Sequence, residues 1–373
     1  MIMPKKNVDC LIIGGGMIGL LSARLLQNAG LSVHLLERQV TAQESSWAGG
    51  GILSPLYPWK QPAAITALAH WSQAHYPSLV AELDAETGID AQHLTSGLLS
   101  LGLTDDEQTQ AVHWAQTNGY ALELLDAATT RQRVPLLKPE LSSVLLPTIA
   151  HVRNPRLTQA LHQSLKKRGV LITEHASVSQ FLLQQGRVIG VKTSAGEFYA
   201  DALVVAAGAW SGELLRLLPD DHLLNIEPVR GQMLLIKAPP QLFTPIIIHH
   251  DRYLIPRKDG RTLVGSTLVY AGFDKSTSAD ARLDLQQAAY QLIPALQDYP
   301  IEHHWAGLRP GSPTGIPCIS PHPLYPGLYI NSGHFRNGVV LAPASCHLLT
   351  QLITQQAPMI DPAPYHWSRL VAE

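Results

Sequence analysis

The sequence has little of several features that would mark a particular class of protein. It has only three cysteines, Cys10, Cys318 and Cys346, and because they form no CxxC pair and no even framework, a disulfide scaffold is excluded and a reducing compartment is favoured. The formal net charge is −2, which gives no reason to expect nucleic acid or an anionic membrane as a partner. No apolar run approaches the eighteen or so residues of a membrane helix. We expect a soluble, cytoplasmic protein without stable membrane association.

The chain is long enough for about two domains. It has 373 residues, of which 46% are hydrophobic and 15% charged, as is ordinary for a globular enzyme. Lys5 and Lys6 precede an apolar stretch and could be taken for a secretory signal. Three consecutive glycines at 14–16 would interrupt the apolar helix of such a signal. We therefore interpret the stretch as the first strand and its turn.

The most informative stretch is residues 8–38, which read as a βαβ unit. The apolar run 10–13 is short enough to be a buried parallel strand, and the run 33–36 is another. Between them, apolar residues recur at helical intervals from Met17 until Gly30 ends the helix. The glycines at GxGxxG spacing and the acid that follows the second strand are Gly14, Gly16, Gly19 and Glu37.

This unit predicts a dinucleotide-binding site. Gly14 permits the tight turn, Gly16 lets the backbone approach a pyrophosphate, and Gly19 lets the helix lie close to the strand. The helix N-terminus attracts the phosphates. Glu37 is placed to accept hydrogen bonds from ribose hydroxyls, which argues against a 2′-phosphate. A bare GxGxxG is weak evidence, but strand, helix, second strand and acid are all present here.

Other segments also place small residues where a ligand could approach the backbone. The segment 45–55 reads SSWAGGGILSP, and the buried run 202–205 ends in AAGAW. Gly333 and Gly338 follow the strand-like run 328–331 and open a helix to about residue 355. Further helices are expected at 63–88, 104–118, 154–169 (capped by Asn154) and 280–296. Strands are expected at 93–103 and 170–179, a hairpin at 188–200, and an antiparallel sheet from 227–237 and 246–265. The segment 135–147 is interpreted as the return of the chain from a second domain.

Five motifs in one order carry a resemblance to a known family. GGGMIG with Glu37 and Arg38, then SSWAGGG, VVAAGAWS, AGLRPG and GHFRNG resemble the D-amino acid oxidase (DAO) family of FAD-dependent flavoproteins, nearly end to end. The resemblance implies an α/β (α+β) fold, with a Rossmann-type FAD-binding domain and a discontinuous second domain on a largely antiparallel sheet. The implied boundaries are 1–85, 150–222 and 305–373 for FAD binding, and 86–149 and 223–304 for the substrate.

The resemblance implies that FAD is bound non-covalently between the two domains. The pyrophosphate, ribose, flavin and adenine contacts are distributed over the motifs. The cofactor-binding residues that it implies are Gly14, Gly16, Met17, Ile18, Gly19, Glu37, Arg38, Ser45, Ser46, Ala48, Gly49, Gly50, Val178, Ala207, Gly208, Trp210, Arg309, His334, Phe335, Arg336, Asn337, Gly338 and Val339.

The same resemblance implies a carboxylate-binding pocket. Arg309 matches the arginine that binds the substrate carboxylate, and a planar guanidinium suits that group because it donates two parallel hydrogen bonds. Tyr253 matches a tyrosine that contacts the same carboxylate, and Arg336 joins the pocket. Two positions depart from the family's pattern, since Asp251 stands where a histidine is usual and Leu268 where a methionine is usual. An added carboxylate at 251 could shift preference toward other amines, unless the side chain faces solvent at a turn, which is the interpretation we favour.

The implied reaction is oxidative deamination of a small amino acid such as glycine. Hydride passes from the α-carbon to FAD, O2 is reduced to H2O2, and the imine supplies the thiazole of thiamine. No side chain is assigned as a general base, because the substrate can bind with its amine already neutral. The expected partners are a small amine and O2, and relatives suggest a homo-oligomer, possibly a tetramer.

Three other interpretations stay open or are disfavoured. A broader D-amino acid or sarcosine-type oxidase or dehydrogenase is the nearest alternative, and a flavin-binding protein without turnover is the alternative from a different class. A disulfide reductase is disfavoured because there is no CxxxxC. No metal is expected, since the adjacent histidines at 249–250 and 303–304 point to opposite faces of a strand.

Overall fold

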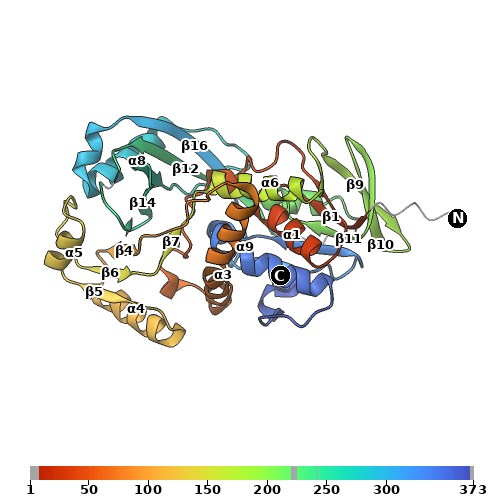
Figure 1. Ribbon diagram of the computed structural model, residues 1–373, viewed down its shortest axis with the longest axis horizontal. Helices are drawn as coiled ribbons and strands as arrows, with labels where there is room; N and C mark the ends of the chain where they lie inside the picture. The colour runs from red at the N-terminus through yellow and green to blue at the C-terminus, as the bar shows by residue number, and fades with distance from the viewer. Residues whose placement is uncertain (1–7, 220–224, 241, 370–373) are drawn as a thin grey trace.

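The strand expected at the start of the chain lies in the middle of the first of two large sheets. The computed structural model describes residues 8–219, 225–240 and 242–369, so Lys5 and Lys6 lie outside the described residues. The molecule is elongated, with one sheet at each end (Figure 1). In the described part of the chain, each of these sheets has eight strands.

The first sheet has the topology of a dinucleotide-binding domain. Its order is β17 (Cys318–Pro321), β18 (Leu328–Ser332), β11 (Gly196–Val205), β1 (Val8–Ile13), β2 (Val33–Leu36) and β8 (Leu171–Thr173), and β10 (Arg187–Thr193) and β9 (Val178–Gln184) extend β11. Strands β18, β11, β1, β2 and β8 run parallel. Because the carboxyl ends of parallel strands share one edge, the turns after β1, β2 and β11 meet there.

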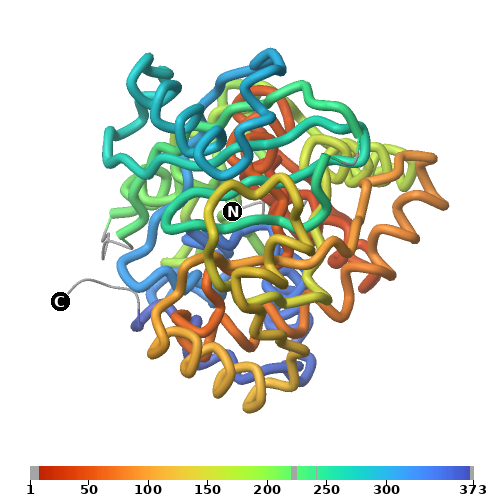
Figure 2. The backbone as a smooth tube through the Cα atoms, turned by 90° about the vertical axis from the view of Figure 1, so that its left-hand side faces the viewer, coloured from red at the N-terminus to blue at the C-terminus, as the bar shows by residue number. Residues whose placement is uncertain are grey.

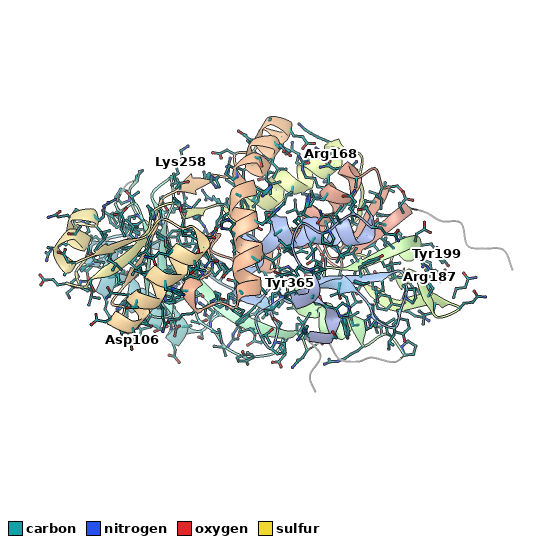
Figure 3. The ribbon with its side chains drawn as sticks, turned by 90° about the horizontal axis from the view of Figure 1, so that it is seen from below. Asp106, Arg168, Arg187, Tyr199, Lys258 and Tyr365 are labelled. Carbon is teal, nitrogen blue, oxygen red and sulfur yellow. The ribbon has the colours of Figure 1, made fainter. Side chains whose placement is uncertain are left out.

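Helices cover one face of this sheet. They are α1 (Met17–Asn28), α3 (Ala63–Thr87), α6 (Asn154–Lys167) and α9 (Gly338–Ile353), and they share a buried core with the sheet. Figure 3 labels Tyr365 near the start of α3 and Arg168 near its end. Tyr365 donates to the carbonyl of Ala64 at 2.7 Å, and Arg168 binds Glu86. None of the described helices is both long and apolar enough to cross a membrane.

The second sheet is largely antiparallel, as expected. Its order is β16 (Ile301–Gly311), β12 (Glu227–Lys237), β15 (Arg261–Gly265), β14 (Arg252–Pro256), β13 (Ile246–His249), β4 (Leu98–Leu101), β6 (Ser143–Leu146) and β5 (Glu123–Leu125). One pair is parallel, β4 with β13. This pair joins two distant segments of the chain, which lie side by side in Figure 2.

The remaining elements are short or peripheral. They are the two-stranded pair β3 (Leu94–Thr95) and β7 (Ala150–His151), and the helices α2 (Ser45–Ala48), α4 (Asp105–Asn118), α5 (Ala127–Arg133), α7 (Ser211–Leu215) and α8 (Ala279–Leu292). The division into domains at the boundaries given above stays a proposal. Strand β16 crosses the proposed boundary at residue 305 within the second sheet.

Some local expectations were wrong. Asn154 is the first residue of α6 and not its cap, and its amide makes no hydrogen bond. The strand expected at 93–103 is two short strands, and the one at 170–179 ends at Thr173. The segment 135–147 contains β6, a strand of the second sheet, so it contributes structure to that sheet as well as leading back to the first.

Candidate active site

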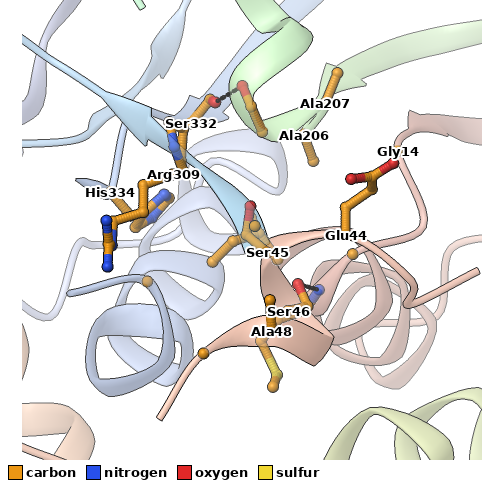
Figure 4. A pocket seen from close by; sticks show the side chains of 18 of the residues that line it. Gly14, Glu44, Ser45, Ser46, Ala48, Ala206, Ala207, Arg309, Ser332 and His334 are labelled. Carbon is orange, nitrogen blue, oxygen red and sulfur yellow. Dashed lines mark hydrogen bonds between the residues drawn. The ribbon is translucent and has the colours of Figure 1, made fainter. Parts of the chain in front are cut away.

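A cavity of about 460 Å³ lies between the two sheets. Its walls come from the carboxyl-end turns of β1, β2 and β11, from α2, from β12, β14 and β16 of the second sheet, and from the start of α9. Figure 4 shows Arg309 and His334 at one side of this pocket and Gly14 and Ala206 at the other. A cavity of this size is in the range of sites for small molecules and cofactors.

The glycines of the first turn are required by close contact. Gly14 has φ +114°, and a Cβ there would lie 2.4 Å from the carbonyl oxygen of Ala206. A Cβ on Gly19 would lie 1.8 Å from the carbonyl oxygen of Gly14. Gly14 and Gly16 face the cavity, whereas Gly19 lies behind them, where α1 packs on β1. The turn can therefore take these positions only without side chains.

Side chains around this turn order the backbone beside the cavity. The carboxylate of Glu37 accepts hydrogen bonds from the N–H of Gly15 (2.8 Å) and of Gln39 (2.9 Å). Ser46 Oγ accepts from the N–H of Met17 at 2.8 Å, at the N-terminus of α1. These bonds fix the first turn against the segments that follow it.

A second group of side chains closes the wall next to Glu37. The guanidinium of Arg38 stacks on Trp210 at 3.7 Å and pairs with Glu44 at 3.2 Å. Trp210 in turn stacks on Phe273. Arg38, Glu44 and Trp210 all line the cavity, so the turn after β2 and the turn after β11 are joined across it.

Residues 48–51, here called the glycine strip, lie along the cavity. The carbonyl of Ala48 accepts a hydrogen bond from Trp305 Nε1 at 3.1 Å, and that of Gly50 accepts from Arg257 Nη2 at 2.6 Å. A Cβ on Gly51 would lie 2.1 Å from the carbonyl oxygen of Val152. The strip therefore offers its backbone to a ligand and is held by the second sheet from behind.

Arg309 on β16 extends its guanidinium into the cavity at the second sheet. Nη2 donates to Ser266 Oγ at 2.7 Å and Nη1 to the carbonyl of Thr267 at 3.2 Å. A Cβ on Gly231 would lie 2.2 Å from Nη2. Burial lowers the pKa of the Arg309 guanidinium. Among the described residues no carboxylate lies within ion-pair distance of it. The arrangement suits an anionic ligand.

Tyr253 on β14 is buried at 7% exposure and lines the same part of the cavity. Its hydroxyl donates to Met233 Sδ at 3.8 Å, a weak bond that a better acceptor can replace. A Cβ on Gly265 would lie 2.4 Å from the tyrosine ring, and one on Gly50 would lie 3.3 Å from it. Two glycines thus make room for this ring beside the cavity.

His334 lies just before the 3-10 turn Phe335–Asn337 that leads into α9. Its Nε2 lies 2.7 Å from Ser345 Oγ, and that hydroxyl donates to Asn331 Oδ1 at 2.6 Å. Burial lowers the pKa of His334 to about 3, so the imidazole is neutral at physiological pH. The Ser345 hydroxyl donates its hydrogen bond to Asn331, so it can only accept one from His334. The imidazole proton therefore lies on Nε2, which donates a hydrogen bond to Ser345 Oγ.

The structure gathers most of the residues implied by the resemblance around one cavity. Of the set given above, only Gly19, Asp251 and Leu268 are absent from its lining. Asp251 is exposed in the turn between β13 and β14, and Leu268 is 41% exposed after β15. The structure therefore does not bring these two side chains to the cavity, and the binding roles of all the residues stay predictions.

Several lining residues were not anticipated from the sequence. They include Gly231, Met233, Ser266, Asn331 and Ser332. Gly231 carried a signal, because a glycine inside a strand often marks a close approach by another group. The others had none, since a methionine or serine in an apolar strand is more often a packing residue.

The cavity fits FAD. The cavity extends from Glu37 and Val178, where an adenosine would lie, past the N-terminus of α1 and the glycine strip to Arg309. The glycines of the first turn and of the strip leave the room that a Cβ would fill, which suits a phosphate and a flat ring. No group of three or more potential metal ligands occurs among the described residues.

The chain belongs to the DAO family of FAD-dependent oxidoreductases, whose model matches residues 9–352. The family resemblance, the fold class and FAD as the cofactor are thereby confirmed. The family and the cavity together define a flavin-dependent oxidoreductase.

Particular relatives refine this class. The chain is 46% identical to the glycine oxidase of Pseudomonas putida over 365 residues, covering 97% of this chain and 98% of that protein. It is 31% identical to the bifunctional protein ThiO/ThiG of Trichormus variabilis, covering 97% of this chain and 55% of that protein. The crystal structure of glycine oxidase from Geobacillus kaustophilus superposes with a TM-score of 0.93, at 27% identity and over 98% of this chain and 99% of that one.

Proposed function

We propose that this protein is an FAD-dependent oxidase that deaminates glycine and similarly small amines. The observation that carries the proposal is Arg309, a partly buried cation in the cavity wall that has no carboxylate partner in the described part of the chain. A guanidinium already oriented by Ser266 and Thr267 can bind a carboxylate without reorganisation. The similarity to glycine oxidases supports glycine as the substrate.

In this proposal the protein binds and orients the substrate, and the cofactor carries the chemistry. When bound, FAD would supply the two-electron oxidation of the substrate, with O2 as the electron acceptor and H2O2 as the product. Arg309 and Tyr253 would hold the carboxylate at the second sheet, and Met233 would give up its bond to Tyr253. We assign no general base, because the substrate would bind with its amine already neutral.

The position of Asp251 favours glycine over a charged amine. Its side chain is exposed and lies outside the cavity lining, so it adds no carboxylate beside the substrate. Sarcosine and D-alanine are the second candidates, because they are small amines that carry the same carboxylate for Arg309. The relatives named ThiO/ThiG support thiazole synthesis as the use of the imine.

We also propose two properties of the protein in the cell. The described cysteines are all free and buried, which supports a cytoplasmic location. The family resemblance described above also implies a homo-oligomer. Size-exclusion chromatography with light scattering on the purified protein tests the oligomer.

The test uses the purified yellow holoprotein. Glycine, sarcosine and D-alanine are added separately without oxygen, and the flavin absorbance near 450 nm is followed before air is readmitted. We expect glycine to bleach the flavin and to release one H2O2 per glycine consumed in air. A flavin that stays oxidised with all three amines would contradict the proposal and would favour a flavin-binding protein without turnover.

A further inference from the structure

Arg257 is a buried cation that none of the preceding roles explains. It follows β14 and is 6% exposed. Nη1 donates to His151 Nδ1 and to the carbonyl of Val152, both at 2.9 Å, and Nη2 donates to the carbonyl of Gly50 at 2.6 Å. A buried guanidinium that binds only neutral acceptors is costly. A cost of this kind calls for a specific use.

The ring nitrogen of His151 that accepts the hydrogen bond from Arg257 is well defined. The imidazole is 1% exposed, and its burial together with the Arg257 charge lowers the pKa of His151 to about 3. A neutral imidazole has one bare ring nitrogen, and here it is Nδ1 that accepts from Arg257. Arg257 keeps its charge near neutral pH, because burial lowers its pKa only to about 10.

The alternation of β14 directs three side chains toward one backbone position. Tyr253, Ile255 and Arg257 are two residues apart, so they share one side of the strand. A Cβ on Gly50 would lie 2.8 Å from Ile255 Cδ1 and 3.3 Å from the Tyr253 ring, and the Gly50 carbonyl is bound by Arg257. Gly50 is therefore the point where the glycine strip meets the strand that carries Tyr253.

The strip is held on its other side by the chain before α6. The N–H of Val152 donates to the carbonyl of Gly51 at 2.9 Å, and the N–H of Leu53 donates to that of Ala150. Because Arg257 binds Val152 and Gly50 together, it joins the strip, the α6 approach and β14 through one planar group. Only a guanidinium, which donates from two nitrogens in one plane, can reach the carbonyls of Val152 and Gly50 at the same time.

We propose that Arg257 is a positioning residue that fixes the glycine strip relative to Tyr253, and so sets the geometry in which cofactor and substrate meet. The proposal rests on the proposed function, in which the strip lies along FAD and Tyr253 binds the substrate. Small displacements between reacting groups lower the rate of a reaction more than they lower ligand affinity. Loss of Arg257 should therefore affect kcat more than KM.

The test compares Arg257→Met with Arg257→Lys and with a matched control, Arg153→Met. Arg153 lies at the same junction between the sheets, where it pairs with Asp259 at 2.8 Å, but it does not contact the strip. For each folded holoprotein we would measure the visible circular dichroism of bound FAD, the FAD dissociation constant, Tm, kcat and KM. The spectrum and the dissociation constant do not depend on turnover.

For Arg257→Met we expect an altered visible spectrum, roughly tenfold weaker FAD binding and a kcat roughly tenfold lower, with KM changed less than about threefold. Arg257→Lys keeps the charge but not the fork and should lie between. Arg153→Met should lower Tm and leave the spectrum native. If Arg257→Met does not fold, Arg257→Lys decides. A native spectrum, native FAD affinity and native kcat in the deciding variant would overturn the proposal.

The outcomes also separate this proposal from the proposed function. If the unmodified protein does not oxidise glycine, the proposed function fails, whereas the flavin spectrum still shows whether Arg257 positions the strip. If glycine is oxidised and the spectrum, the FAD affinity and kcat of the deciding variant are native, only the positioning role fails.

Discussion

The two ends of the cavity are built in different ways. At the end near the first turn, the walls are backbone, shaped by Gly14 and Gly16. At the other end, the walls are single side chains that come from separate strands, with Arg309 on β16, Tyr253 on β14 and Met233 on β12. The first end is local in sequence, and the second exists only once the second sheet has formed.

This difference predicts different kinds of failure. A substitution at the backbone end adds atoms where none fit, so the cofactor should be lost whatever the chemistry of the new side chain. A substitution at the side-chain end removes a charge or a donor, so the cofactor should stay while the substrate is bound less well. The predictions below test this contrast, beginning with the largest effect.

Gly19→Ala should abolish FAD binding. The new Cβ would lie 1.8 Å from the carbonyl oxygen of Gly14, and a backbone oxygen in a constrained turn cannot move aside. Overpacking of this kind costs up to about 3 kcal/mol, and a cost of that size in the turn that binds FAD corresponds to a loss of roughly 100-fold in affinity. The ratio of absorbance at 450 nm to that at 280 nm in the purified protein measures the FAD content.

Gly30→Asn is the matched control for this variant. Gly30 ends the turn after α1 with φ +89°, and a Cβ there meets no atom within 4 Å. Asparagine tolerates positive φ better than other side chains, so FAD content should be unchanged. Equal loss of FAD in both variants would show that the βαβ unit is generally fragile and would remove the steric explanation.

Arg309→Ala should weaken substrate binding far more than FAD binding. Removing a charged donor from a partly buried carboxylate site costs about 3 kcal/mol, or roughly 100-fold in the dissociation constant for glycine or glycolate. The loss of FAD should be less than about threefold, because Arg309 meets the cavity from the second sheet. A titration of flavin absorbance with glycolate measures the first, and FAD content the second. Parallel loss of both would refute the assigned role.

The backbone end of the cavity could be predicted from the sequence, whereas the side-chain end could not. The strand, turn, helix and acid of residues 8–38 are consecutive, and the structure has them as β1, α1, β2 and Glu37. The antiparallel character of the second sheet also followed from its alternating segments. In both cases the pattern reports local geometry, which short stretches of sequence determine.

The side-chain end depends on contacts between distant residues. Gly231 and Arg309 are neighbours because β12 pairs with β16 in register, and Ser266 reaches Arg309 from the end of β15. No spacing of residues in the sequence predicts these contacts. Arg309 and Tyr253 were anticipated only through the resemblance to the DAO family, and Arg257 was not anticipated at all.

Side chains also support the backbone end of the cavity, because they hold together the helices that pack behind it. Glu86 is one such side chain. It binds Arg24 on α1 and Arg168 after α6. Burial acts to raise the pKa of Glu86, but hydrogen bonds from Arg168, Arg24 and Ser164 outweigh it and lower the pKa to about 2. Because the folded pKa lies below the unfolded value, this group contributes stability above about pH 4.5, and the contribution is lost as pH falls toward 2.

Glu86→Gln should therefore lower the free energy of unfolding at pH 7 by about 2 kcal/mol, since the buried Arg24 cation loses one of its two carboxylate partners and keeps only Glu82, at 3.2 Å. The difference from the unmodified protein should shrink between pH 4.5 and pH 2. Urea unfolding at several pH values measures it. Glu140→Gln is the control, because its pair with Arg131 is exposed on both sides and should contribute almost nothing. A pH-independent difference would exclude the ionised carboxylate as the cause.

The smallest effects should come from the residues that orient Arg309 without touching the cofactor turn. In Gly231→Ala the new Cβ would lie 2.2 Å from Nη2, so the guanidinium must rotate away from Ser266. Because a side chain can move where a backbone oxygen cannot, we expect only about a tenfold rise in the glycolate dissociation constant, with full FAD content. Ser266→Ala removes one hydrogen bond and should cost about threefold to tenfold. If Gly231→Ala instead lost FAD as Gly19→Ala should, the two ends of the cavity would not be separable, and the contrast between them would fail.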